Sequence, residues 1–363
     1  MKNKKNAQTG KSLLFTLLCV TCYLLSGCYT LKQGTALLGY LSKAVPLESL
    51  LEAADGTETE ETEKNRRFVE QVQDIRQFAT MELGLNMTKN YTRYVSIDRD
   101  YLAAVVSAAA TDSLTRHEWK YPVVGALPYK GFFNDDDARK ERAKLEKKGL
   151  DVWIRGIDAF STLGWFNDPL YSYMRDYPVD RLADLIIHES LHATVFLKGQ
   201  AEFNEELAEF VGSEGARLYM ESRFGIDTEE YRAMVASNED SRRFAAFIQE
   251  LAEELETAYK SGADRDEILR EKERIINAAK ERFDADYENS FTSDNYRDFS
   301  SMPINNAYID LYRLYYSEDN FFAELFEKSG TDLPAFIAAA KSMPKKGPPG
   351  RERLTQALEL VQP

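Results

Sequence analysis

The sequence predicts an α+β fold with a small mixed or antiparallel sheet and a mostly helical C-terminal half. Segments between residues 92 and 166 are rich in Val, Ile, Tyr, Phe and Trp and are punctuated by Gly and Pro, which is typical of strands. From Pro178 onward, apolar residues recur at helical spacing with charged residues between them. With 363 residues, of which 44% are hydrophobic, the chain is long enough for one large domain or two ordinary ones.

The N-terminus has the pattern of a secretory signal. MKNKKNAQTGKS carries four lysines and no acid, and the apolar run LLFTLLCVTCYLL follows, too short to be a convincing membrane span. The run ends in LSGC, which resembles the lipobox of bacterial lipoproteins. We therefore expect Cys28 to carry lipid and to hold the protein at a membrane, in the cell envelope and outside the cytoplasm. Because Tyr29 and not an aspartate follows, we expect the outer membrane in a cell with two membranes.

Charge and cysteine content exclude some functions. The formal net charge is -14, and an acidic chain repels phosphate backbones, so we expect no nucleic-acid partner. Cys19 and Cys22 would leave with the signal, and Cys28 would carry lipid. The exported part then has no thiol for a disulfide, catalysis or metal binding, and a metal must be held by histidine and carboxylates. The oligomeric state is not predicted.

The predicted elements follow from periodicity and from start and stop signals. Helical spacing before Gly84 follows a polar linker, and the acidic start and glycine stop of DDDARKERAKLEKKGL indicate a helix among the strands. Helices are predicted over 29–54, 67–84, 135–150, 180–197, 203–222, 229–260, 264–288, 305–328 and 332–342, with a linker over 56–67 and an irregular tail, PKKGPPGRER. The predicted divisions are a signal over 1–27, a helical segment and linker over 28–66, a catalytic core over 67–225, a helical insertion over 226–295 and a C-terminal part over 296–363 that completes the cleft.

The stretch HESLH contains two of the three histidines in the chain. Residues four apart lie on one side of a helix, so His188 and His192 project together, at a separation that one zinc ion can bridge. Glu189 lies about 100° round the helix from His188 and could reach a water molecule at that ion. This is the H-E-x-x-H pattern, with two ligands and a general base, and its chance expectation in this composition is on the order of 0.003.

A catalytic zinc site also needs a third protein ligand. FNEELAEF begins the next predicted helix, and Glu205, Glu206 and Glu209 are all candidates. The segment from Asn204 to Ala208 resembles the N-E-x-x-A segment that supplies the third ligand in thermolysin-like and aminopeptidase zincins, which favours Glu205. Glu209, one turn further on, could orient a ligand histidine or be an ordinary surface charge.

The chain resembles the bacterial zinc aminopeptidase family of predicted lipoproteins. The matching segments are LSGCYT, MELGLNMTKNYTRYV, PVVGALPYKGFF, GLDVWIRGIDAFSTLGWFNDPL, HESLHATVFLKGQAEFNEELAEFVGSEG and Asn305-Asn306-Ala307. The resemblance implies a zincin-like metallopeptidase fold, in which His188, His192 and Glu205 bind Zn²⁺ and Glu189 is the base. The long helices of 229–288 exceed what the resemblance accounts for, and we attach no function to them.

Catalysis would also need a donor for the tetrahedral oxyanion. The candidates are Tyr308, Tyr312, Tyr315 and Tyr316, and we select Tyr315, although a helical tyrosine row is more often core. The remaining histidine, His117, is expected in a turn or on the surface. By resemblance to zincins, FSTLGWF, over 160–166, could edge the cleft and pair with an extended peptide; the alternative is an ordinary core strand.

The sequence therefore predicts a membrane-tethered zinc metallopeptidase, an aminopeptidase by resemblance, with a peptide as substrate. Two alternatives stay open. The first is a zinc-binding envelope lipoprotein without peptidase activity, which would need a closed site with four protein ligands. The second is an endopeptidase, because the sequence does not show which acidic residue would hold a substrate ammonium group.

Overall fold

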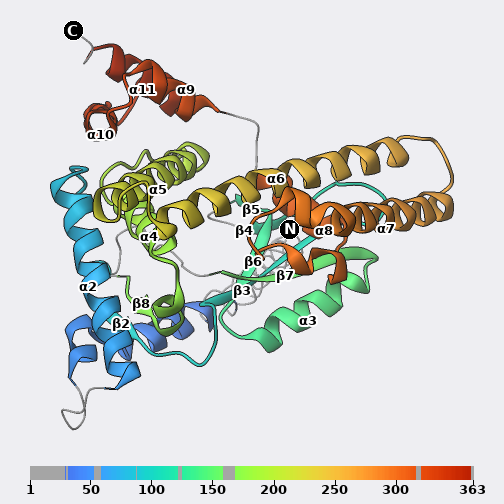
Figure 1. Cartoon of the computed structure of the whole chain (residues 1–363). Coiled ribbons are helices and arrows are strands. Elements are labelled where there is room, and N and C mark those ends of the chain that lie inside the picture. Colours follow the sequence, from blue (N-terminus) through green and yellow to red (C-terminus); the bar gives the residue numbers. More distant parts are fainter. Residues whose placement is uncertain are drawn as a thin grey trace, which may run out of the picture.

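The computed structural model describes residues 29, 32–52, 59–86, 88–121, 125–157, 168–315 and 320–360 (Figure 1). The proposed signal, Cys28 and the predicted cleft strand over 160–166 lie outside the described residues. Within the described ranges, no helix is both long and apolar enough to cross a membrane.

The principal sheet is antiparallel and has β3 (Ala103–Ala110) at its centre, between β6 (Tyr129–Phe132) and β7 (Leu150–Ile157). β3 reads AAVVSAAA and is buried over seven of its eight residues, because helices cover both of its faces. α3 (Asp135–Glu146) and α8 (Asn306–Tyr315) both pack on β3. The small side chains of β3 let both helices approach the sheet closely.

Two smaller sheets complete the β structure. β1 (Val45–Pro46) pairs antiparallel with β2 (Arg93–Val95), which pairs parallel with β8 (Leu170–Tyr171). β4 (Trp119–Tyr121) pairs with β5 (Gly125–Leu127). The small mixed and antiparallel sheets and the dominant helices confirm the predicted α+β class.

The N-terminal helices differ from the prediction. Helix occupies 32–42, and the chain then forms β1 and the 3₁₀ helix η1 (Leu47–Leu51) where a helix to residue 54 was predicted. Pro46 explains the break, because it disfavours helical backbone at the residue before it. α2 (Glu60–Met81) begins inside the predicted linker. Thr59 and Thr62 form a reciprocal capping box there. The negative charges of Glu60 and Glu61 lie at the positive end of the helix dipole and stabilise the start of the helix.

α4 (Val179–His192) and α5 (Ala201–Arg223) pack against each other and against α2 in the largest apolar cluster of the described residues. The 3₁₀ helix η2 (Ser172–Asp176) leads into α4. The predicted hairpin is confirmed as α6 (Glu229–Tyr259) and α7 (Arg265–Ser290), the long pair that projects to the right in Figure 1. A second apolar cluster joins this hairpin to α8 and to the 3₁₀ helix η3 (Arg297–Ser301).

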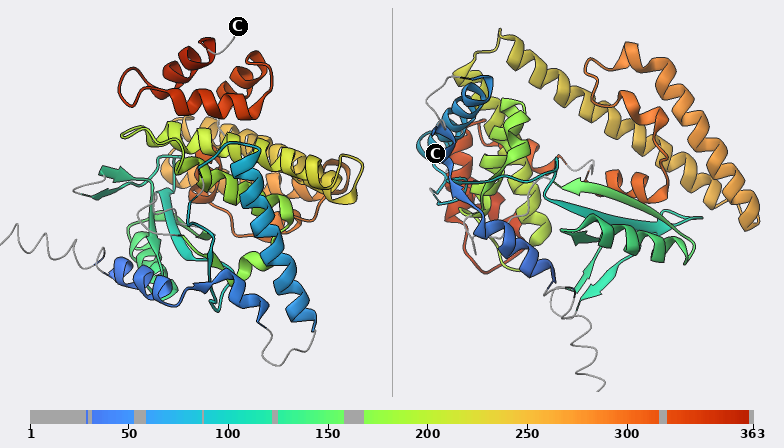
Figure 2. Two further views of the ribbon diagram at one scale, coloured as in Figure 1. Left: turned by 90° about the vertical axis from the view of Figure 1, so that its left-hand side faces the viewer. Right: turned by 90° about the horizontal axis from the view of Figure 1, so that it is seen from below.

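The C-terminal segment forms α9 (Phe321–Lys328), α10 (Leu333–Ser342) and α11 (Gly350–Glu359). The prediction of an irregular tail was wrong for α11, whose Leu354, Ala357 and Leu358 are buried on one face. These helices pack on α5 through the Phe210 ring, which lies 5.5 Å from that of Phe326. They lie at the upper edge of the molecule in the left panel of Figure 2, with the helix over 32–42 at the lower left.

Candidate metal centre

α4 carries both histidines of HESLH on its last turns. Its buried side is apolar, with Ile186, Ile187 and Leu191 almost fully covered, and this packing fixes the rotation of the helix. His188 and His192 therefore project from one side, with ring centroids 4.9 Å apart. α4 ends at His192, five residues before the predicted end at 197.

Side chains hold the turn that follows α4. The Thr194 hydroxyl donates to the Ser190 carbonyl at 2.7 Å and accepts the Asn86 N–H at 2.9 Å. Asn204 is 3% exposed; its amide accepts the Leu197 N–H and donates to the Leu197 carbonyl, both at 2.9 Å. These bonds replace helical ones, which explains the early end of α4. They also fix the start of α5 at Ala201, four residues before Glu205.

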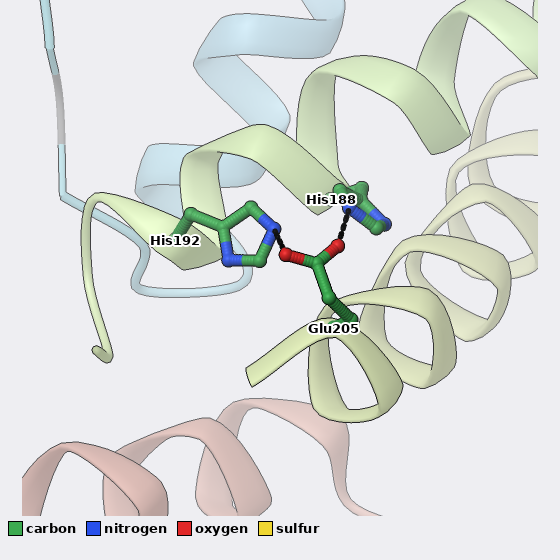
Figure 3. Close-up of side chains that lie close together, drawn as sticks. All are labelled: His188, His192 and Glu205. Atoms are coloured by element: carbon green, nitrogen blue, oxygen red, sulfur yellow. Dashed lines mark ion pairs between the residues drawn. The ribbon is translucent and has the colours of Figure 1, made fainter. Parts of the chain in front are cut away.

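The return of the chain brings the Glu205 carboxylate to both histidines. Oε1 lies 3.5 Å from the Nε2 atom of His192, and Oε2 lies 3.8 Å from the Nε2 atom of His188 (Figure 3). One ligand atom from each of the three residues lies within 4.8 Å of the other two. Glu206 instead forms an ion pair with Arg351 of α11, at 2.7 Å. Of the three candidate glutamates, Glu205 is the one that the structure brings to the histidine pair.

The two histidines and Glu205 shift one another's pKa values. Burial, with the neighbouring His192, lowers the pKa of His188 to about 4, so its imidazole is neutral near neutral pH. Burial opposes a charge on His192, but the adjoining Glu205 carboxylate outweighs it and raises the pKa of His192. The contact with His192 in turn lowers the pKa of Glu205. The carboxylate is thus held ionised between two imidazoles.

The spacing and chemistry of the three residues fit zinc. Ligands bound at about 2.0–2.2 Å in a tetrahedral arrangement lie about 3.3–3.6 Å apart, close to the two observed nitrogen–oxygen separations. Two imidazoles and one carboxylate are a donor set that zinc enzymes use. The His192 side chain is 3% exposed, whereas that of Glu205 is 62% exposed, so the cluster is open to solvent on the α5 side. This open side leaves room for a water molecule or a substrate.

Glu189 lies between the two histidines in sequence and is 8% exposed. Beside it is Tyr91, which is 3% exposed and has a positive φ of 59°, uncommon for a residue with a side chain. The pKa of Tyr91 is raised well above its ordinary value, by burial first and then by the charge of Glu189. The Tyr91 N–H donates to the Asp168 carbonyl at 2.8 Å. Sequence reasoning missed Tyr91, because nothing local marks its backbone conformation.

Asp184 and Gly212 are further residues at the site that the sequence did not single out. A Cβ atom on Gly212 would lie 2.3 Å from Oδ1 of Asp184 and 3.0 Å from Cβ of His188, so only glycine fits between α4 and α5 there. Burial, followed by the charges of Glu209 and Asp180, raises the pKa of Asp184 to about 7. Burial also raises the pKa of Glu209, although this residue keeps contact with solvent. The spacing of Gly212 and Gly215 on one helix was the available signal of close packing.

The other predicted site residues do not join this cluster. His117 packs edge-on against Trp119, with ring centroids 4.7 Å apart. Tyr308 is 4% exposed, and its ring lies 4.8 Å from that of Trp153 in the second apolar cluster, where Tyr312 also packs. These two tyrosines therefore belong to the core. Tyr315 ends α8, but its side chain, like Tyr316, is outside the described part of the chain.

Comparison with known proteins assigns the chain to a family. Residues 28–355 match the model of a family described as "Putative aminopeptidase". No curated protein and no solved structure matches the chain. The match covers nearly the whole sequence, including both histidines, Glu189 and Glu205. The chain belongs to this aminopeptidase family.

Proposed function

We propose that this protein is a zinc metallopeptidase whose metal is held by His188, His192 and Glu205. The observation that carries the proposal is the meeting of these three side chains from two helices, with Glu189 on the same helix as the histidines. The family supports a peptidase, and the donor set supports zinc as its metal.

The residues of the proposed site then have defined roles in hydrolysis. A zinc ion bound at the cluster would supply a Lewis acid that activates water and polarises a carbonyl group. Glu189 accepts the proton of the attacking water and delivers it to the nitrogen of the leaving amine. Glu189 is buried, so this proton exchange is shielded from bulk water. Tyr315 remains our candidate for the donor to the oxyanion.

We further propose that the protein is tethered through lipid on Cys28 and acts on peptides in the cell envelope, at the outer membrane where there are two. The lysine-rich start, the short apolar run and LSGC support export and lipidation. The family description supports removal of residues from free N-termini. An acidic side chain near the metal would then hold the substrate ammonium group, and Glu209, an exposed residue, lies one turn from Glu205.

A peptide-library digest tests this function. The soluble domain, residues 29–363, is incubated with free and N-acetylated peptides, with and without a chelator. We expect stepwise loss from free N-termini, which the chelator abolishes and added zinc restores. Internal cuts in N-acetylated peptides would replace the aminopeptidase assignment by an endopeptidase. Full activity in the chelator would overturn the metal assignment, and bound zinc without any hydrolysis would favour a zinc-binding lipoprotein.

A further inference from the structure

Tyr29, the residue directly after the proposed lipid carrier, is fixed to the folded domain. Its ring lies edge-on to Phe132 at 5.7 Å and close to Tyr121 at 6.2 Å. The ammonium group of Lys130 lies 4.7 Å from the ring centre, and the Tyr29 hydroxyl donates to the Gly131 carbonyl. These four contacts of one side chain hold the start of the domain to β4 and β6.

The helix over 32–42 is attached to the same region. Lys32 forms an ion pair with Asp137 at the start of α3, and the Gln33 amide oxygen accepts the Phe133 N–H at 2.9 Å. Further along, the Tyr40 ring lies 5.9 Å from that of Phe133. Consecutive Cα atoms are about 3.8 Å apart, so a lipid on residue 28 would be one residue from this docked segment. A flexible tether, by contrast, would add about 3.3–3.6 Å of reach for each residue.

The surface around Tyr29 has the chemistry of a membrane-contacting face. Residues 129–150 contain seven basic and five acidic side chains, although the whole chain has a formal net charge of -14. Exposed lysines lie there, including Lys140 with 78% and Lys144 with 61% of the side chain accessible. The rings of Tyr29 and Tyr121 are only partly buried. Tyrosine and lysine suit a lipid headgroup region, because each combines an apolar body with a polar end.

We propose that the anchor face, formed by Tyr29, β4, β6 and α3, lies against the phospholipid surface and holds the domain in one orientation. This inference rests on the proposed lipidation of Cys28. In the left panel of Figure 2, α9–α11 lie at the upper edge and the helix over 32–42 lies at the lower left, so α9–α11 are farther from the bilayer in that orientation. The basic balance of the anchor face favours anionic headgroups, whereas the acidic remainder of the chain is repelled by them. The metal centre, on α4 and α5, is therefore held at a fixed height above the membrane.

Site-specific fluorescence quenching tests the orientation. After removal of the signal the chain has no cysteine except Cys28, which lipid would occupy, so a single introduced cysteine can be labelled cleanly. Lys140→Cys on α3 and Glu324→Cys on α9 both replace exposed residues. The lipidated full chain carries a small fluorophore at one position in vesicles of phosphatidylethanolamine with a minor share of phosphatidylglycerol. A quencher is attached to the lipid headgroups.

We expect several-fold stronger quenching at position 140 than at position 324. Tyr29→Ala, which removes the docking contacts and leaves Cys28 in place, should reduce that contrast. Equal quenching at both positions in protein that floats with the vesicles would overturn the orientation and leave the tether intact. Protein that does not float, and whose mass shows no lipid on Cys28, would overturn the tether itself. An unchanged contrast in Tyr29→Ala would show that Tyr29 is not the rigid link.

Discussion

The Nε2 atom of His192 lies 3.5 Å from Oε1 of Glu205, although the two residues are on different helices joined by a turn. Because of this contact we propose Glu205, of three nearby glutamates, as the third metal ligand. We expect Glu205→Gln to weaken zinc binding by more than about a hundredfold, which exceeds the usual effect of removing a group that only orients a ligand. Glu209→Gln is the matched control, and its zinc affinity should stay within about tenfold of the wild type. Competition with a chromophoric chelator measures both, and a reversed order would assign the ligand to Glu209.

Gly212 tests whether the spacing of α4 and α5 sets the ligand geometry. A Cβ atom there would press on Asp184 and on Cβ of His188, so Gly212→Ala should move His188 and reduce zinc affinity by about tenfold. Gly215→Ala also crowds this interface, but against Ile187 and Leu83, away from the metal ligands. It should lower the melting temperature with little effect on zinc affinity. Equal zinc affinities in the two variants would contradict this role for Gly212.

Asp184 should make stability depend on pH. Its folded pKa of about 7 lies above the unfolded value of 3.8, so the folded state holds a proton that the unfolded state has lost between these values. Stability contributed by this group therefore falls as pH rises from about 4 to 7. Asp184→Asn should gain stability relative to the wild type over that window, by at most about 4 kcal/mol above pH 7.

Urea unfolding of chelator-treated protein between pH 4 and 8 measures the Asp184 effect without a contribution from bound metal. Glu202→Gln, at an exposed position on α5, is the control for the loss of a carboxylate charge at the surface. If the free energy difference between Asp184→Asn and the wild type stays constant across this range, Asp184 is not protonated in the folded protein.

Asn204 should support the metal centre indirectly. Asn204→Ala leaves the Leu197 N–H and carbonyl without their partner, at a cost of about 1–3 kcal/mol for each buried group. Because Asn204 precedes Glu205, zinc affinity should fall together with stability. Asn86→Ala removes a weaker 3.4 Å contact of the same turn and should change both quantities less. Denaturation and zinc titration of the two variants measure stability and zinc affinity. A fully stable Asn204→Ala protein would contradict the supporting role of Asn204.

The sequence predicted the fold where the pattern was local and strong. HESLH lies on a helix as expected, and the long charged segments form α6 and α7. The predicted element boundaries were wrong where tertiary contacts determine where an element ends. α4 ends at His192 because Asn204 and Thr194 take over backbone hydrogen bonds, and no propensity in HATVFL reveals those partners. The two-residue strand β8 exists only through its pairing with β2.

The sequence predicted which three residues meet at the candidate site, but it did not predict their surroundings. Scarcity of histidine and cysteine narrowed the ligand choice to two histidines and a carboxylate. Asp184 and Tyr91 could not be found in this way, because their importance comes from burial beside residues distant in the chain. The tyrosine row of α8 shows the converse, since Tyr308 and Tyr312 serve the core, the alternative that periodicity alone favours.

Turnover of zinc-loaded Glu189→Gln protein tests the central claim most directly. The substitution keeps the shape of the side chain and removes its ability to accept a proton, while His188, His192 and Glu205 are unchanged. We predict one zinc ion for each chain and hydrolysis slower by about 10²–10⁴-fold than in the wild type, the usual contribution of a general base. Zinc-replete Glu189→Gln protein that cleaves peptides at the wild-type rate would contradict the proposed mechanism.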